Sequence, residues 1–395
     1  MRKPHYIFSI LFMLSSSSLY AESTKDTLEL LDLPAYSSKL ANKSIVMSLT
    51  PSDNGVIAVG ERGHILLWQS NDDWQQEEVP VSVAVSSVTI LSDGSKIAVG
   101  HDSVILKSEK DSSQWRKVFT GWELTSLKID LLKTQQTSLE AVIENTKDED
   151  ELDELTYKLD DIIFGIEDTE LEKTAGPNQP LLSVARTNND TLFAIGAYGL
   201  FLTSLDKGAT WQLISDRIDN PDKFHLNDII YTQDNQLFIV AENGLAFNST
   251  DNGVSWSIME MPYSGSLFGI ISNDKAPKEL VAFGLQGNLM VSIDSGKSWQ
   301  YNKLPTSASL LGGTFLNSGQ AVIVGHGGRV VTLYANNMKG LQVQQHPSGA
   351  ALSSVVEQGE QLVLGGQYGI EFWQPKQYVE LNALTEQTTK NNNDK

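Results

Sequence analysis

The chain has 395 residues, with 29 lysines and arginines against 49 aspartates and glutamates, a net charge of −20 and no cysteine. Without cysteine it holds no disulfide, no zinc–thiolate site and no thiol nucleophile. The acidic balance repels nucleic acid and anionic lipid surfaces, so we expect neither as a partner. With 40% apolar residues, a chain of this length buries a sizeable core.

The N-terminus has the pattern of a secretory signal peptide. Arg2 and Lys3 precede an apolar stretch over residues 6–14, and a small residue, Ala21, stands at the expected cleavage site. That stretch is too short to span a bilayer, and no later one approaches the ~20 apolar residues of a membrane helix. We expect residues 1–21 to be removed and the protein to be exported in soluble form, with no direct membrane insertion. A buried N-terminal helix is the alternative.

An apolar run, a Gly-x-x-Gly turn and a second apolar run recur along the chain. The equivalent points, Gly60, Gly100, Gly196, Ala241, Gly284, Gly325 and Gly365, are separated by steps of 40, 96, 45, 43, 41 and 40 residues. A step of 40–45 residues is the length of one four-stranded propeller blade, which buries its faces only against its neighbours. The repeat therefore predicts an all-β, seven-bladed β-propeller.

The spacing also divides the chain. We expect an N-terminal segment over 22–43, blades 1–2 over 44–120, blades 3–7 over 181–380 and a disordered polar tail over 381–395. Two segments, 28–33 and 378–381, are alternatives for the outer strand that closes the ring.

The 96-residue step implies an extra element between blades 2 and 3. A decayed eighth blade is one interpretation, but the helical spacing of its residues favours an insertion over 121–180. A heptad seam is formed by Leu152, Leu155, Leu159, Ile162 and Ile166, and a shorter one by Leu132, Leu139 and Val142. With a break at residues 146–150 and a helix start at Asp148, the pattern predicts an α-helical hairpin, its second helix over about 150–166.

This insertion is strongly acidic. Residues 121–180 contain 16 acidic and 5 basic residues, a net charge of −11. Either it is a solvated hairpin that buries only its own seam, or it is an acidic docking element for a partner.

An eight-residue pattern, Ser-x-Asp-x-Gly-x-x-Trp, occurs three times after a Gly-x-x-Gly hairpin. Its Asp and Trp positions are Asp206 and Trp211, Asp251 and Trp256, and Asp294 and Trp299. In such a turn the Asp can bond turn amides and the Gly can take a positive φ, and we expect the Trp to start the next strand as a large packing element. Decayed copies lie at 70–74 and 108–115. The pattern resembles the Asp-box, or BNR, repeat of sialidase-type propellers, in which these carboxylates are structural.

Further segments indicate which group of propellers the chain resembles. Those that carry it include Gly196-Ala197-Tyr198-Gly199, Phe283-Gly284-Leu285-Gln286-Gly287 and Val324-Gly325-His326-Gly327-Gly328. Over about residues 44–375 they resemble bacterial propellers similar to photosystem II stability and assembly factors. Members with a helical insert before a Gly-Pro-x-x-Pro segment, here Gly176 to Pro180, resemble accessory proteins of RND- or MMPL-type exporters. The resemblance implies a non-enzymatic periplasmic scaffold or assembly factor for a membrane protein complex.

A glycan-binding or sialidase-like glycoside hydrolase is the alternative function. A sialidase needs three arginines converging on the substrate carboxylate, a Tyr-Glu nucleophile pair and an Asp acid/base. The arginines beyond the signal peptide are Arg62, Arg116, Arg186, Arg217 and Arg329, and no Arg-Ile-Pro type motif accompanies them. We therefore expect no catalytic residue, no cofactor and no metal site.

The usual propeller winding places the insertion and the Gly-x-x-Gly turns on one face. We predict a binding surface there made of turn residues and their neighbours, namely Arg62, His101, Asp102, Tyr198, Asn243, Tyr263, Gln286, His326, Arg329 and Tyr368. For each of them, a solvated turn residue without function is the alternative.

Overall fold

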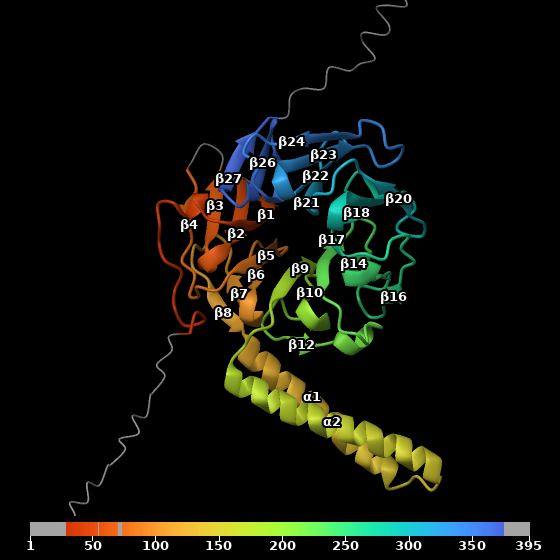
Figure 1. Ribbon diagram of the computed structural model, residues 1–395. Coiled ribbons are helices and arrows are strands. Elements are labelled where there is room, and N and C mark those ends of the chain that lie inside the picture. Colours follow the sequence, from red (N-terminus) through yellow and green to blue (C-terminus); the bar gives the residue numbers. More distant parts are fainter. Residues whose placement is uncertain (1–28, 54, 70–72, 375–395) are drawn as a thin grey trace, which may run out of the picture.

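The computed structural model describes residues 29–53, 55–69 and 73–374, which form a propeller-like ring of seven antiparallel sheets with two long helices at its edge (Figure 1). The expected signal peptide, the segment 378–381 and the tail 381–395 lie outside the described residues. In the part of the chain that the structure describes, no helix is long and apolar enough to cross a membrane.

We number the sheets 1 to 7 in chain order; within the described residues the first six have four strands and the seventh has three. Sheet 1 contains β1 (Val46–Ser52), β2 (Gly55–Gly60), β3 (Ile65–Gln69) and β4 (Gln75–Gln76); sheet 2 contains β5 (Val85–Ile90), β6 (Lys96–Gly100), β7 (Ile105–Ser108) and β8 (Arg116–Phe119). Sheet 3 contains β9 (Leu181–Arg186), β10 (Leu192–Gly196), β11 (Phe201–Ser204) and β12 (Gln212–Leu213); sheet 4 contains β13 (Leu226–Tyr231), β14 (Leu237–Ala241), β15 (Ala246–Ser249) and β16 (Ser257–Ile258). Sheet 5 contains β17 (Leu267–Asn273), β18 (Ala276–Gly284), β19 (Asn288–Ser292) and β20 (Gln300–Lys303); sheet 6 contains β21 (Leu310–Phe315), β22 (Ala321–Gly325), β23 (Arg329–Leu333) and β24 (Gln342–Gln345). Sheet 7 contains β25 (Leu352–Gln358), β26 (Gln361–Gly366) and β27 (Gly369–Trp373).

The core lies between the sheets. The second strands β6, β10 and β14 are buried along their whole length, and their aliphatic residues suit a strand that is covered on both faces. Between sheets 3 and 4, for example, Phe193 and Phe201 pack with Ile239 and Phe247. A sheet therefore buries its faces only by contact with its neighbours in the ring.

Strand register identifies the equivalent point of each repeat. The first residue of the inner strand pairs with the glycine before the turn, as in Val46 with Gly60 and Val85 with Gly100. In sheet 7 the corresponding partner of Leu352 is Gly366, so Gly365, chosen from the spacing alone, was wrong by one residue.

The segment 28–33 does not supply the ring-closing strand. Its described part forms a turn, and the Leu30 carbonyl accepts a hydrogen bond from the Ser82 amide at 2.8 Å. Lys117 on β8 also donates to the Leu31 carbonyl at 2.8 Å, so this segment lies against sheets 1 and 2. These hydrogen bonds hold the segment away from the outer edge of sheet 7. Within the described residues, β27 pairs only with β26, so no strand from this segment is added to sheet 7.

Sheets 7 and 1 meet through their inner strands. The Ser353 hydroxyl donates to the Val46 carbonyl at 2.6 Å, and the Leu49 amide donates to the Ser354 hydroxyl at 3.1 Å. A core beneath these bonds contains Val56 and Ala58 from sheet 1 and Val363 from sheet 7.

The helices α1 (Gly121–Ile143) and α2 (Glu149–Ala175) lie between β8 and β9 in the chain. Asp148 caps α2 by accepting the Glu151 amide at 3.0 Å, at the predicted start, but α2 extends nine residues beyond the predicted end at 166. The five apolar residues of the predicted α2 seam are half-buried. In α1 the prediction for Val142 was wrong: it is 49% exposed, and Ile143 lies on the seam instead.

Sheets 2 and 3 stay joined although the chain leaves the ring between them. Asp190, only 3% exposed, accepts the Ser92 amide at 2.9 Å, and the Lys207 ammonium lies 3.5 Å from its carboxylate. Lys207 also pairs with Asp93 at 2.8 Å. Burial alone would raise the pKa of Asp190, but the bonds from Ser92 and Lys207 outweigh it and hold that pKa below its ordinary value.

Asp228 connects three inner strands. From β13 its carboxylate accepts the Ser183 hydroxyl of β9 at 2.8 Å and the Ile270 amide of β17 at 3.1 Å. Burial raises the pKa of Asp228 despite these bonds, because the ionised form loses more hydration than they return.

The first prediction concerns Asp228. Because its folded-state pKa is raised, the stability that the protonated form contributes is lost as pH rises through that pKa. We expect the free energy of unfolding of the wild type minus that of Asp228→Asn to fall as pH rises above about 4, the ordinary pKa of an aspartate. Asp228→Ala leaves two buried donors unpaired and should cost about 1–3 kcal/mol. Denaturant titrations over this pH range test both; a wild-type-minus-asparagine difference that rises with pH contradicts the assignment.

The second prediction concerns the hairpin. Replacing residues 130–168 by a short Gly-Ser loop should leave the ring folded, because Leu124 and Ile129, the buried apolar residues of α1, are kept. Circular dichroism should lose helix signal only, and thermal unfolding should stay cooperative. Loss of cooperative unfolding would show that the ring needs the whole hairpin. We call this protein the short-hairpin variant.

Candidate functional site

The turns between the second and third strands lie at one end of the ring, which we call the turn face. They are the short 3-10 helices η2 (Glu61–Gly63), η3 (His101–Ser103), η4 (Ala197–Gly199), η6 (Glu242–Gly244), η7 (Leu285–Gly287) and η8 (His326–Gly328). Each turn is anchored to its own sheet; the His101 amide, for example, donates to the Ala84 carbonyl at 2.9 Å. Antiparallel strand order puts the crossovers to the next sheet at this same end.

Most of the predicted binding residues occupy turn tips. The middle residue of five turns has a φ near +55°, and these residues are Arg62, Asp102, Tyr198, Asn243 and Gln286. In sheet 6, Gly327 takes that position, and His326 precedes it as His101 precedes Asp102. Tyr368 lies in the shorter turn of sheet 7.

Exposure separates the predicted residues into two groups. Seven are exposed: Arg62, His101, Tyr198, Asn243, Gln286, His326 and Tyr368. The other three, Asp102, Tyr263 and Arg329, are half-buried. Burial raises the pKa of Asp102, although the neighbouring His101 opposes this shift.

The ten residues do not converge on one point; two of them lie in small aromatic clusters. The ring of Tyr198 contacts the ring of His225 edge-on, with ring centroids 4.8 Å apart. Nδ1 of His225 in turn lies 3.7 Å from a carboxylate oxygen of Glu242. Tyr263 stacks on Tyr301 with ring centroids 6.0 Å apart. His225, Glu242 and Tyr301 were not predicted, because each is placed by contact between elements remote in sequence.

The remaining turn residues are spread around the ring. His101 and His326 belong to sheets 2 and 6, which do not adjoin. Among the described residues, no group of three or more His, Asp or Glu side chains is placed to hold a metal ion.

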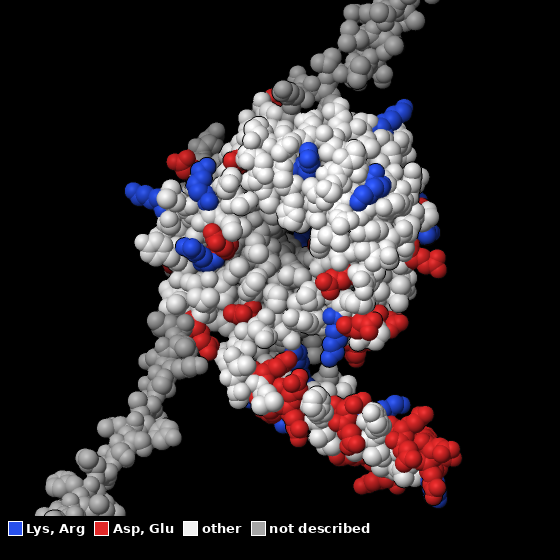
Figure 2. All heavy atoms as spheres, viewed as in Figure 1, with Lys and Arg blue, Asp and Glu red and all other residues white. Residues whose placement is uncertain are grey.

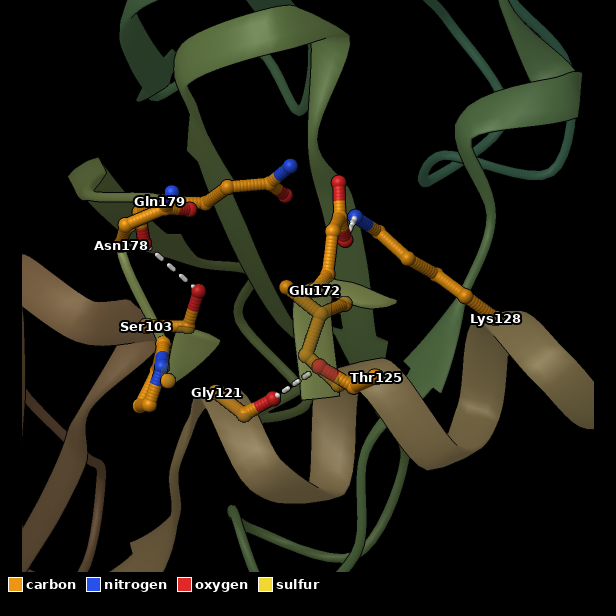
Figure 3. A pocket seen from close by; sticks show the side chains of 10 residues that line it. Ser103, Gly121, Thr125, Lys128, Glu172, Asn178 and Gln179 are labelled. Carbon is orange, nitrogen blue, oxygen red and sulfur yellow. Dashed lines mark hydrogen bonds and ion pairs between the residues drawn. The ribbon is translucent and has the colours of Figure 1, made fainter. Parts of the chain in front are cut away.

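The hairpin leaves the ring on the turn face, beside η3. The Ser103 hydroxyl donates to the Gln179 carbonyl at 2.7 Å, and Lys128 of α1 pairs with Glu172 of α2 at 3.2 Å (Figure 3). A side chain on Gly121 would have its Cβ 2.2 Å from that of Pro177, so the two ends of the hairpin are in close contact. The cavity between them measures about 10 Å³, room for about one water molecule. The base is therefore closely packed.

Acidic side chains gather along this hairpin, whereas charges on the visible face of the ring are scattered (Figure 2). α2 alone contains eleven acidic residues and two lysines. Within the described part of the chain, the only α2 carboxylates in ion pairs are Glu170, with Lys133 of α1, and Glu172, with Lys128 of α1. The hairpin thus presents largely uncompensated negative charge beside the turn face.

The arginines do not form a carboxylate-binding triad. Arg62 is the middle residue of η2 in sheet 1, Arg329 directly follows η8 in sheet 6, and Arg116 lies on β8 in sheet 2. Arg186 ends β9 beside Asp190, at the opposite end of the ring from the turn face. Arg217 follows β12 and donates to the Gly253 carbonyl at 3.3 Å. These positions on different sheets and at both ends of the ring do not match a sialidase site.

The Asp boxes lie at that opposite end, between the third and fourth strands of sheets 3, 4 and 5. Asp206 accepts the Thr210 amide at 2.8 Å and its hydroxyl at 2.7 Å, and the Ser204 hydroxyl donates to Asp206 at 2.8 Å. Asp251 and Asp294 make the same contacts with the residue four positions later.

These hydrogen bonds lower the pKa of the three carboxylates. For Asp206 and Asp251, bonds from Thr210 and Ser255 bring the pKa to about 2. Around Asp294, desolvation opposes the bonds from Ser298, and the pKa is still lowered.

Each box also packs against the preceding sheet. Trp256 contacts the rings of Phe193 and Phe201 edge-on, with centroids 6.1 and 5.3 Å away. Trp211 is buried, and Trp299 donates to the Gly296 carbonyl at 3.1 Å. The bonding of the carboxylates within their own turns supports a structural role.

No family model matches the chain, and no curated protein matches it in sequence. Solved structures do match the chain in fold. YCF48 bound to a D1 peptide is 12% identical with a TM-score of 0.55, and the match covers 87% of this chain and all of that one. The extracellular domain of the one-component system BT4673 from B. thetaiotaomicron is 14% identical with a TM-score of 0.57, over 88% of this chain and 40% of that one.

An enzyme is also among these neighbours. A catalytically inactive virginiamycin B lyase from Staphylococcus aureus with quinupristin is 13% identical with a TM-score of 0.60, over 83% of this chain and 94% of that one. At such identities the likeness shows the fold alone. The chain has an all-β, propeller-like fold that resembles YCF48.

The third prediction concerns the Asp boxes. Asp251→Ala removes the acceptor of the Ser255 amide and hydroxyl and should lower stability by about 0.5–2 kcal/mol, as for a lost helix cap. Because the folded pKa of Asp251 is depressed, the stability tied to its charge is present above the ordinary pKa and is lost as pH falls toward about 2. Asp251→Asn keeps one acceptor oxygen and should show less acid dependence than the wild type. Melting curves between neutral and acidic pH measure both. Unchanged melting together with lost partner binding would argue for a binding role instead.

Proposed function

We propose that this protein is a non-enzymatic scaffold that works in the periplasm as an accessory or assembly factor for a membrane protein complex. One observation carries the proposal: an acidic helical hairpin with a closely packed base projects beside a face of exposed polar and aromatic turns. A ring with a projecting arm provides two surfaces for protein contact. The likeness to YCF48 fits a scaffold role.

The partner we propose is an RND- or MMPL-type exporter. This rests on the sequence resemblance of the insert and the following Gly-Pro-x-x-Pro segment to the exporter-associated propellers. The pattern of residues 1–21 supports export, and the similarity to an extracellular domain is compatible with it. In this proposal the predicted turn-face residues contact the complex together with the hairpin.

The arrangement of charge and of arginines favours this function over the glycan-active alternative. A sialidase-like site needs converging guanidinium groups, and the five arginines of the described residues are distributed over both ends of the ring. The negative hairpin suits a basic protein surface, since complementary charge raises association rates and selects partners.

The fourth prediction tests partner capture. Tagged protein should recover an exporter complex from detergent-solubilised membranes, and recovery should fall with rising salt because exposed charges are screened within ~8 Å at physiological ionic strength. The short-hairpin variant should recover less. Tyr198→Ala combined with Tyr368→Ala removes two tip side chains that are each 57% exposed and tests the turn face separately.

Leu205→Ser combined with Ile293→Ser, at exposed residues on the Asp-box end, is the matched control and should capture as the wild type does. N-terminal sequencing of protein from a periplasmic extract tests export, and should begin at Glu22. Recovery of no membrane protein, or uncleaved cytoplasmic protein, would contradict the proposed function.

A further inference from the structure

α2 carries a second apolar stripe that the hairpin does not bury. Tyr157, Phe164 and Leu171 are 72, 69 and 66% exposed. They are spaced by seven residues, so at about 100° per residue they lie within about 40° of one another on the helix surface and span about 21 Å along it. The seam residues Leu159 and Ile166 lie on the opposite side of the helix, against α1.

Such a stripe costs free energy in water unless something covers it. Single exposed apolar residues are ordinary, but three large ones in line on a helix are the pattern of a helix–helix seam. Within the described residues, none of the three has a ring contact or side-chain hydrogen bond. The hairpin is thus a two-helix unit with one further face suited to a third helix.

Carboxylates line both sides of the stripe. Asp153, Asp160 and Glu167 lie along one edge and Asp161 and Asp168 along the other, by their helical positions. All five are exposed, and none forms an ion pair with another described residue. Charge therefore determines which occupants the stripe accepts.

Two occupants are disfavoured by this charge. A second copy of the chain would bring an equally acidic α2 against the first, and like charges at the edges of a helical seam oppose pairing. An anionic membrane surface is repelled in the same way. A helix with an apolar seam bordered by Lys and Arg would cover the stripe with apolar side chains and would pair its basic side chains with the carboxylates on both edges.

We propose that the outer face of α2 binds an amphipathic helix of a partner protein, with apolar residues at heptad spacing on Tyr157, Phe164 and Leu171 and basic residues on the flanking carboxylates. The complex is a three-helix arrangement along the part of the arm between the middle of α2 and its base. This deepens the proposed function by naming the kind of partner segment, and rests on it only for the identity of the protein that supplies the helix.

Binding of synthetic helices to the full protein tests the chemistry. The probe is a 28-residue peptide with a Leu seam at heptad spacing and Lys on both sides of it; one control peptide has Glu in place of Lys, and another has the same composition scrambled. We expect fluorescence anisotropy to show binding of the Lys-flanked helix only, weakened by salt. Equal binding of the scrambled peptide would overturn the proposal, because it would show attraction by charge alone.

Variants locate that binding. A triple variant, Tyr157→Gln, Phe164→Gln and Leu171→Gln, removes the stripe but keeps helix-forming residues. Its affinity for the Lys-flanked peptide should be at least tenfold lower than that of the wild type. The matched control is Leu205→Ser, Val254→Ser and Ile293→Ser, three residues exposed to a similar degree on the Asp-box end, which should leave affinity unchanged. Circular dichroism verifies that both variants keep their helix content. Equal effects of the two variants would place the binding elsewhere.

Cross-linking in cells tests the natural occupant. A photoreactive phenylalanine analogue at position 164 should link to a partner protein within a helix that has the predicted basic, amphipathic pattern, whereas the same group at position 293 should not. Links to a second copy or to lipid would overturn the proposal, as would no link at all. If the glutamine variant still captures the membrane complex, the stripe is not the docking site and the proposed function stands. If peptides bind but no membrane protein is captured, the proposed function fails instead.

Discussion

The junction between sheets 7 and 1 is the contact on which the rest of the structure depends. No sheet has a core of its own, so each is stable only while both neighbours are in place, and the chain must bring its two ends together to complete the ring. In the described residues the junction is made by Ser353 and Ser354 on the inner strand and by the apolar layer around Val56 and Val363. These contacts join residues about 300 positions apart, so forming them costs more loop-closure entropy than forming the contacts within one sheet.

Polar groups at the inner strands make these junctions specific. The hydrophobic effect has no preferred direction, whereas a buried hydrogen bond is directional and fixes the relative position of the two groups that it joins. Asp228 holds sheets 3, 4 and 5 in register, and Asp190 does the same for sheets 2 and 3 on the opposite end from the hairpin. Because Asp190 and Lys207 join those sheets directly, the ring tolerates an insertion between them.

Much of the fold follows from local sequence. The repeat of turn glycines, the three Asp boxes and the α2 seam each depend on neighbours within a few residues, so their spacing is visible without a structure. What was missed depends on distant contacts: the turn over residues 30–33 is fixed by Ser82 and Lys117, and the Tyr198–His225 pair by two different sheets. The stripe of Tyr157, Phe164 and Leu171 was missed because its heptad spacing equals that of the seam, and only the position of α1 tells which set is buried.

The closely packed base at Gly121 and Pro177 makes the hairpin a lever. α2 is about 40 Å long, so a tilt of about 5° at the base would move the tip by roughly 3–4 Å. The stripe of Tyr157, Phe164 and Leu171 lies nearer the base, about 6–27 Å from the end of α2, so the same tilt would move it by no more than about 2 Å. The close approach of Gly121 to Pro177 therefore limits how far the arm can tilt relative to the turn face.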